Sequence, residues 1–169
     1  MDFKAFEKLT CGLYIVSTAC DGQKAGCIVN TVTQVTAIPP QVMVAIHKDN
    51  TTTEVLQKAG VFHITALTEQ APLPLIGRFG YRSSKEIDKF AEFETLVDSN
   101  GCPYTPVGAA AHFTCKLVQQ CDVGTHILFS GEVEDAQPLS EDTPMSYSYY
   151  HTVKKGMTPP RASSYQPKA

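Results

Sequence analysis

GLYIVSTACDGQKAGCIVNTVTQVT, residues 12–36, contains two strand-like stretches joined by a tight turn. Apolar residues over residues 12–18 follow the period of a strand with one buried face. Asp21-Gly22 supplies residues that tolerate the positive φ of a hairpin turn. A long second strand is expected over residues 26–36, and Pro39-Pro40 ends it because proline lacks the amide hydrogen that a ladder needs. The chain is therefore predicted to begin as a pair of antiparallel strands.

About six strands with few, short helices are expected along the chain. The further strands are Val42–Ile46, Val61–Leu67, Ala111–Gln119 and His126–Asp135, and the polar stretch Gly80–Pro106 should carry little regular strand. Helices are expected from Thr51, with Glu54 completing a capping box, to Gly60, around Pro74–Phe79 and over Met145–Val153. Strands and helices do not alternate regularly, and neither G-x-G-x-x-G nor G-x-x-x-x-G-K-[ST] occurs. This pattern indicates a β-barrel or sandwich with added helices rather than a Rossmann or P-loop domain.

Composition narrows the class of protein. The 169 residues include 14 Lys and Arg against 17 Asp and Glu, and the net charge of −3 argues weakly against nucleic-acid binding, which depends on clustered cations. No apolar run approaches the ~20 residues that a membrane span needs. Residues 1–9 carry both charge signs and lack the apolar stretch of a signal peptide. One cytoplasmic domain with no nucleic-acid or membrane partner is expected.

The six cysteines do not indicate a metal site. None belongs to a C-x-x-C pair, the spacing that zinc and thioredoxin-like sites use. Disulfides are not expected in the cytoplasm. Cys115 alternates with Phe113 and Leu117 on one face of an expected strand, as a small buried hydrophobic residue would. We expect mostly buried thiols and no metal.

Residues 30–36 are more polar than a core strand requires. Strand alternation places Asn30, Val32, Gln34 and Thr36 on one face, and Thr31, Thr33 and Val35 on the other. Their hydroxyl and amide groups could bind a heteroaromatic ring that bears carbonyls and ring nitrogens. An edge strand exposed to solvent explains the same pattern equally well.

Two further segments could bind a ligand. In KDNTTTE, residues 48–54, a helix N-terminus, the Lys48 ammonium group and threonine hydroxyls together suit a phosphate. A well-capped helix without a ligand is the alternative. In DVGTH, residues 122–126, His126 lies on the strand face opposite Ile127 and Phe129. An exposed histidine without a role is the alternative there.

Together these segments resemble the FMN-binding split-barrel flavin reductases. The matching residues are Gly26, Asn30-Thr31, Gln34-Val35-Thr36, Pro39-Pro40, residues 46–52, residues 61–64, Gly77–Gly80, Asp88–Phe90, residues 122–133 and the ending from Tyr147 to Pro159. The resemblance covers essentially the whole chain and is closest to the flavin reductase module of high-molecular-weight rubredoxins. It implies a mainly β fold: a six-stranded antiparallel split β-barrel with short helices, assembled as a homodimer. The barrel domain would span residues 1–155, and residues 156–169 would be a C-terminal tail or arm.

The same resemblance implies roles for individual residues. The flavin ring would be lined by Asn30, Thr31, Val32, Gln34, Val35 and Thr36; the phosphate would be held by Lys48, Asn50, Thr51 and Thr52; and a loop near the flavin would contain Arg78, Phe79, Gly80 and Lys89. His126 would be the catalytic residue, facing the ring from the side where nicotinamide docks.

The implied function is oxidoreduction with FMN as cofactor and NADH or NADPH as cosubstrate, the flavin supplying the redox chemistry. Electrons would pass to free flavin, to an iron protein such as rubredoxin on a separate chain, or to a partner oxygenase or reductase. One alternative is a non-catalytic FMN-binding electron-transfer protein that uses the same site, which a covered ring face would favour. Another is a structural split-barrel protein without flavin, and the joint presence of Lys48, Thr51 and His126 argues against it.

Overall fold

A computed structural model, which describes residues 1–165, shows a protein built around one antiparallel β-sheet. Its seven strands lie in the order β2-β1-β5-β8-β9-β4-β3, and every neighbouring pair is antiparallel. They are β1 (Tyr14–Cys20), β2 (Gln23–Val29), β3 (Val32–Ala37), β4 (Pro40–His47), β5 (Val61–Leu67), β8 (Ala109–Asp122) and β9 (His126–Pro138). The expected mainly β, antiparallel architecture with short helices is confirmed.

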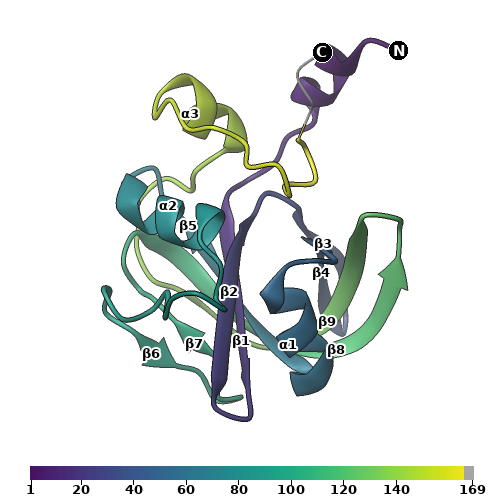
Figure 1. Ribbon diagram of the computed structural model, residues 1–169, viewed down its shortest axis with the longest axis vertical. Coiled ribbons are helices and arrows are strands. Elements are labelled where there is room, and N and C mark those ends of the chain that lie inside the picture. The colour runs from purple at the N-terminus through teal and green to yellow at the C-terminus, as the bar shows by residue number, and fades with distance from the viewer. Residues whose placement is uncertain (166–169) are drawn as a thin grey trace.

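Short helices and a small second sheet surround the main sheet. They are the 3₁₀ helix η1 (Phe3–Lys8), α1 (Thr51–Ala59), α2 (Leu73–Tyr81), α3 (Tyr147–Thr152), and the paired strands β6 (Leu96–Val97) and β7 (Pro103–Tyr104). Helix α3 lies at the same end of the molecule as the N-terminus, whereas β6 and β7 lie toward the opposite end (Figure 1). Within residues 1–165, no helix has the length and apolar character that crossing a membrane requires.

The main sheet has seven strands rather than the expected six, because the long strand predicted over residues 26–36 is divided in two. Strand β2 pairs with β1, whereas β3 pairs with β4, and only Asn30 and Thr31 lie between them. Since β2 and β3 are the two edges of the sheet, this short link carries the chain from one edge to the other. The unbroken alternation predicted for this stretch is therefore wrong, and a register shift between Gln34 and Thr36 interrupts it again.

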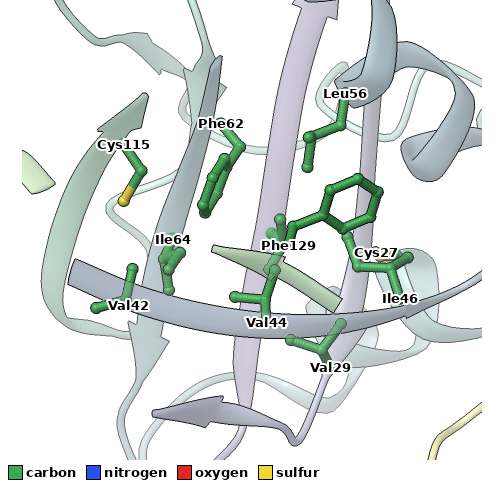
Figure 2. Close-up of a cluster of buried hydrophobic side chains, with 11 residues drawn as sticks. Cys27, Val29, Val42, Val44, Ile46, Leu56, Phe62, Ile64, Cys115 and Phe129 are labelled. Atoms are coloured by element: carbon green, nitrogen blue, oxygen red, sulfur yellow. The ribbon is translucent and has the colours of Figure 1, made fainter. Parts of the chain in front are cut away.

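The sheet curls around the larger hydrophobic core. Six strands and α1 contribute its buried side chains, which are Val16, Cys27, Val29, Val42, Val44, Ile46, Leu56, Phe62, Ile64, Cys115 and Phe129. In Figure 2 these side chains converge from the surrounding strands, and Leu56 reaches in from α1. Gly131 lies so close to Phe62 that a Cβ there would overlap the aromatic ring. Close packing of this kind makes the curled sheet a rigid base for the loops at its end.

A second core on the other face of β1 fixes α2 and α3. Side chains of β1 alternate between the two cores, with Val16 in the first and Ile15 in the second. Ile76 and Phe79 of α2 and Tyr150 of α3 pack with Ile15 in the second core. Both helices are thereby held beside the end of the sheet where β2 passes into β3.

Helix α1 is capped by Asn50. The Asn50 side-chain oxygen accepts a hydrogen bond from the Thr52 amide at 3.0 Å. The predicted capping box between Thr51 and Glu54 is wrong, because the Glu54 carboxylate instead pairs with two lysines on the exposed side of the helix. Gly60 ends the helix with φ of 68°, as expected for a left-handed C-cap.

Candidate functional site

A small cavity lies where the ends of β2 and β4 and the start of β9 meet α2 and α3. Its polar lining residues are Asn30, His47, Asn50, His126, Arg161 and Ser163, and three tyrosines, Tyr81, Tyr147 and Tyr150, line it as well. We call it the His126 cavity. Its volume is about 30 Å³, which is room for a water molecule or two.

His126, the predicted catalytic residue, presents one hydrogen-bond donor to this cavity. Its Nε2 lies 3.2 Å from the Arg161 carbonyl oxygen, and its Nδ1 lies 2.9 Å from the Thr125 hydroxyl. Because a carbonyl can only accept, Nε2 carries the hydrogen and Nδ1 accepts from Thr125. Burial lowers the pKa of His126 and the adjacent His47 ring lowers it further, although the bond to Arg161 opposes the shift. His126 is therefore neutral at pH 7.

The link between β2 and β3 supplies the second polar group of the cavity. Asn30 is buried, and its amide nitrogen donates to the Ser164 hydroxyl at 2.8 Å. The Asn30 carbonyl oxygen accepts from Ser163 at 2.8 Å, and the Thr31 hydroxyl lies 2.9 Å from the same Ser163 oxygen. Two residues predicted to line the flavin ring thus bind hydroxyl groups from a distant part of the chain.

Residues 156–165, predicted as part of a tail or arm, lie across the His126 cavity, and we call them the C-terminal strap. Hydroxyl groups of Tyr81 and Tyr150 donate to the Met157 carbonyl at 2.5 and 3.3 Å. Beyond Met157, Pro159 and residues 161–163 form part of the cavity wall. Sequence reasoning missed these lining residues, since the stretch has no apolar period, and its only signal was a polar Arg-Ala-Ser-Ser run after two prolines.

The predicted phosphate-binding residues are only partly gathered at the cavity. Asn50 lines it, whereas Lys48, Thr51 and Thr52 do not. The Lys48 ammonium group forms an ion pair with the Asp122 carboxylate at 2.6 Å. The hydrogen bond from Lys48, together with one from the Gly124 amide, lowers the pKa of Asp122. Thr51 and Thr52 are buried in the first turn of α1. The helix N-terminus is therefore close to the cavity, but its neighbouring cation already has a carboxylate partner.

Three of the four residues predicted near the flavin make contacts that support the fold. Lys89 is buried and donates to the carbonyls of Gly26 and Phe79 at 2.7 and 3.0 Å. Arg78 donates to two backbone carbonyls and pairs with a surface glutamate. Phe79 packs in the second core. Of these four residues, Gly80 alone lines the His126 cavity.

A larger groove, which we call the open groove, shares Asn30 with the His126 cavity and has a volume of about 1300 Å³. Of the residues predicted to line the flavin ring, Asn30, Thr31, Val32 and Gln34 line this groove, whereas Val35 and Thr36 lie exposed farther along β3. The β2–β3 link thus faces both spaces. Together they offer hydrogen-bond donors and acceptors beside apolar surface, the usual composition of a cofactor site.

The groups available for metal binding are few. Within residues 1–165, no cluster of three or more His, Cys, Asp or Glu side chains could hold a metal ion, and the six cysteines are free thiols. The chemistry that the described side chains offer at the cavity is hydrogen bonding, mostly from neutral groups, with the charged Arg161 also among the lining residues.

Known proteins are similar in sequence to this chain across nearly its whole length. The profile of the flavin reductase like domain matches residues 6–156. A ferric-chelate reductase (NAD(P)H) of Archaeoglobus fulgidus is 42% identical over 165 residues, covering 98% of each chain. A high molecular weight rubredoxin of Moorella thermoacetica is also 42% identical over 165 residues, covering 98% of this chain and 72% of the rubredoxin.

A solved structure shows the same architecture. Flavin reductase HpaC, determined in complex with NADP+, superposes with a TM-score of 0.74 at 26% identity, over 85% of this chain and 89% of that one. The resemblance inferred from the ordered motifs is confirmed by these matches. The chain belongs to the family of flavin reductase like domains.

Proposed function

We propose that the protein binds FMN where the His126 cavity meets the open groove, and that it passes electrons from NADH or NADPH through this flavin to an acceptor. The family and the 42% identical ferric-chelate reductase supply the general activity, NAD(P)H-dependent oxidoreduction with a flavin. The observation that carries the assignment of the site is the N–H of His126, which faces the same cavity as Asn30 at the β2–β3 link.

The polar groups at the site fit an isoalloxazine ring and its phosphate. Asn30 offers both a donor and an acceptor, and Thr31 adds a hydroxyl, which suits a ring that bears carbonyls and nitrogens. Asn50 and the first turn of α1 would face the phosphate, where the helix end favours an anion. When bound, FMN would supply the redox chemistry, accepting electrons from the nicotinamide and releasing them one or two at a time.

His126 would act as a fixed neutral donor rather than as an acid. The Thr125 hydroxyl holds Nδ1, so Nε2–H points into the cavity in one tautomer. Such a donor can orient a carboxamide or stabilise negative charge on a carbonyl oxygen. The nearby aromatic side chains of Tyr147 and Tyr150 reduce the space open to water. By orienting the carboxamide, the His126 donor would bring the reacting groups of nicotinamide and flavin close together.

A second copy of the chain is proposed to cover the open groove, giving a homodimer with the flavin near the interface. The groove is lined by apolar side chains that are only partly buried, including Tyr14, Val32, Phe113 and Val133. The neighbouring strand β3 is an edge strand, and Val35 on it is 45% exposed. Unpaired edges and apolar grooves are places where a partner stabilises a protein. Light scattering at micromolar concentration should give twice the mass of the chain, and a monomer would contradict the proposal.

The electron acceptor and the cellular location are part of the same proposal. The acceptor would be free flavin, an iron protein such as rubredoxin on a separate chain, or a partner oxygenase. Six free thiols fit the reducing cytoplasm, which we propose as the location.

The visible spectrum of the purified protein mixed with FMN tests the function. Anaerobic NADH or NADPH should bleach the protein-bound flavin absorbance within seconds, and addition of an acceptor should restore it. Dithionite is the matched control, because it reduces bound flavin without a nicotinamide site. Bleaching by dithionite alone would point to a non-catalytic electron carrier, and the absence of any bound flavin would point to a structural protein. The same titration with FAD tests the choice of flavin.

A further inference from the structure

The C-terminal strap occupies the groups that the proposed function assigns to ligands. The Arg161 carbonyl accepts the N–H of His126, at 3.2 Å. A few residues on, the hydroxyls of Ser163 and Ser164 hold both ends of the Asn30 amide, each at 2.8 Å. We propose that the strap is an internal competitor for the site, which the flavin and its nicotinamide cosubstrate must displace from Asn30 and His126.

The space left beneath the strap supports this reading. The His126 cavity has a volume of about 30 Å³, whereas sites for ligands of cofactor size measure roughly 300–1,000 Å³. Five of its lining residues, Met157, Pro159, Arg161, Ala162 and Ser163, belong to the strap. Movement of this one segment would therefore enlarge the cavity and free its polar groups at the same time.

The two ends of the strap are held differently. At the near end, Gly156 packs so tightly against the Tyr150 ring that a Cβ would overlap it, and Met157 accepts two tyrosine hydroxyls. At the far end, Arg161, Ser163 and Ser164 are exposed, and they are held at the site by hydrogen bonds to His126 and Asn30. Exposed hydrogen bonds open more easily than buried packing. The far end is thus the part that can leave while residues 156–158 stay anchored.

The chemistry of the strap resembles that of the ligands it would exclude. The Arg161 backbone carbonyl, bonded to His126, occupies the position proposed for a carboxamide oxygen. The Ser163 and Ser164 hydroxyls, bonded to Asn30, occupy the position proposed for polar groups of the flavin. Each hydrogen bond of this kind contributes only modestly to stability, because water can replace the partner. A few such bonds are enough to keep the strap closed most of the time without blocking the site permanently, and a closed fraction of about 90% lowers the apparent affinity of a ligand about tenfold.

Truncation tests the proposal, which rests on the proposed function. A chain that ends at Thr158 lacks the far end of the strap but keeps its anchor. A chain that ends at Tyr165 is the matched control, because it keeps every strap contact described here. The chain ending at Thr158 should bind FMN about tenfold more tightly, with faster association, as measured by quenching of flavin fluorescence in stopped flow.

A full-length variant provides the second arm. Ser163→Ala with Ser164→Ala removes the hydroxyls that hold Asn30 while keeping the strap backbone, and should tighten FMN binding about threefold to tenfold. Ser99→Ala, on the exposed turn between β6 and β7, is the control and should leave the affinity unchanged. Equal affinity of the truncated and control chains would overturn the proposal. Weaker binding by the truncated chain would also overturn it, since the strap would then be part of the bound site.

Proteolysis of the wild-type chain measures displacement of the strap directly. Trypsin cleaves after Arg161, whose carbonyl is the acceptor for His126. Saturating FMN should speed this cleavage several-fold if the strap is displaced, and mass spectrometry identifies the fragment. Unchanged or slower cleavage with FMN bound would contradict displacement. If none of the chains binds FMN or FAD, the proposed function itself fails, and the competitor role fails with it.

Discussion

His126 at the cavity and His63 beneath the β6–β7 sheet are both histidines on strands, yet their surroundings differ in kind. His63 is 0% exposed, its Nδ1 lies 2.9 Å from a carboxylate oxygen of Asp98, and its ring stacks on Tyr104 at a centroid distance of 4.2 Å. His126 is only partly buried, and its acceptor is a backbone carbonyl of the exposed strap residue Arg161. His63 is held by buried contacts with Asp98 and Tyr104, whereas the hydrogen-bond acceptor of His126 belongs to a segment that can move away.

The region around His63 is a buried polar layer, and His63, Thr65 and His112 do not line the His126 cavity. Four buried side-chain atoms there have no hydrogen-bond partner: His63 Nε2, Thr65 Oγ1, His112 Nδ1 and Thr114 Oγ1, all on β5 and β8. Asp98 accepts the backbone amides of Asn100 and Cys102 besides its bond to His63. Asp98 thereby joins the segment that follows α2 to the outer face of the sheet. The contrast teaches that a buried histidine–carboxylate pair can serve the fold, whereas a neutral histidine facing an exchangeable partner is suited to a site.

The largest effect is expected where the buried pair is broken. Asp98→Ala would leave His63 Nδ1 and two backbone amides without an acceptor in a buried place. A buried donor left without its acceptor costs about 1–3 kcal/mol, and three donors lose theirs here, so a total of about 3–5 kcal/mol is expected. We expect the free energy of unfolding in urea to fall by about this amount. Asp142→Ala, at an exposed residue, is the control and should change it by less than about 0.5 kcal/mol. A loss below about 1 kcal/mol for Asp98→Ala would remove the distinction between the two regions.

The matching change at the cavity should affect the reaction rather than the fold. His126→Ala removes one positioned donor, and we expect reduction of bound FMN by NADH to slow about 10- to 100-fold, or about 1.4–2.8 kcal/mol in the barrier. Urea stability should stay close to wild type, because His126 is only partly buried. FMN should still bind, tightened at most a few-fold by loss of the hydrogen bond that His126 makes to the strap. His126→Gln keeps an N–H near the same position and should recover part of the rate. Anaerobic stopped flow measures the step, and a wild-type rate in His126→Ala would refute the role.

Sequence patterns predicted the strands and the histidine position better than they predicted the walls of the site. Period-two alternation marks β5, β8 and β9 because each has one face in a core. The break at Asn30 and Thr31 has no local signal, since it depends on β2 and β3 pairing with different neighbours. Lys89 is polar in sequence yet buried, because its ammonium group meets two backbone carbonyls from distant segments. Contacts across long separations of the chain, including those of the strap, cannot be read from a local pattern.

The pH dependence of stability should separate the two histidines further. Burial lowers the pKa of His63 below its usual 6.5 despite the opposing bond to Asp98, and the neighbouring His112 lowers it too. The unfolded chain therefore binds a proton that the folded chain resists, so stability is full above pH 6.5 and declines as the pH falls below it. The slope for one such group approaches about 1.4 kcal/mol per pH unit at most.

Urea unfolding at pH 7.5, 6.5 and 5.5 measures this decline. His126→Gln should retain most of the slope, because His126 is only partly buried and its lowered pKa contributes less. Hydrogen bonds from His63 and two backbone amides outweigh burial and lower the pKa of Asp98, so a further loss follows only at pH values below about 4. A flat profile from pH 7.5 to 5.5 would show that His63 is not held neutral by the fold.

The smallest effect is expected at the exposed ion pair beside the cavity. Lys48 and Asp122 are 2.6 Å apart, but their side chains are 38% and 64% exposed, so solvent screens the pair and its loss should leave stability nearly unchanged. If Lys48 assists the FMN phosphate, Lys48→Ala should weaken FMN binding about threefold to tenfold at low salt, and less at high salt. Asp122→Asn should act in the opposite sense and tighten FMN binding about twofold to threefold, because it releases the ammonium group from its carboxylate. Fluorescence titration of both variants at two salt concentrations measures these changes. Equal affinities for wild type and both variants would place the phosphate away from Lys48, while leaving the contrast between His63 and His126 intact.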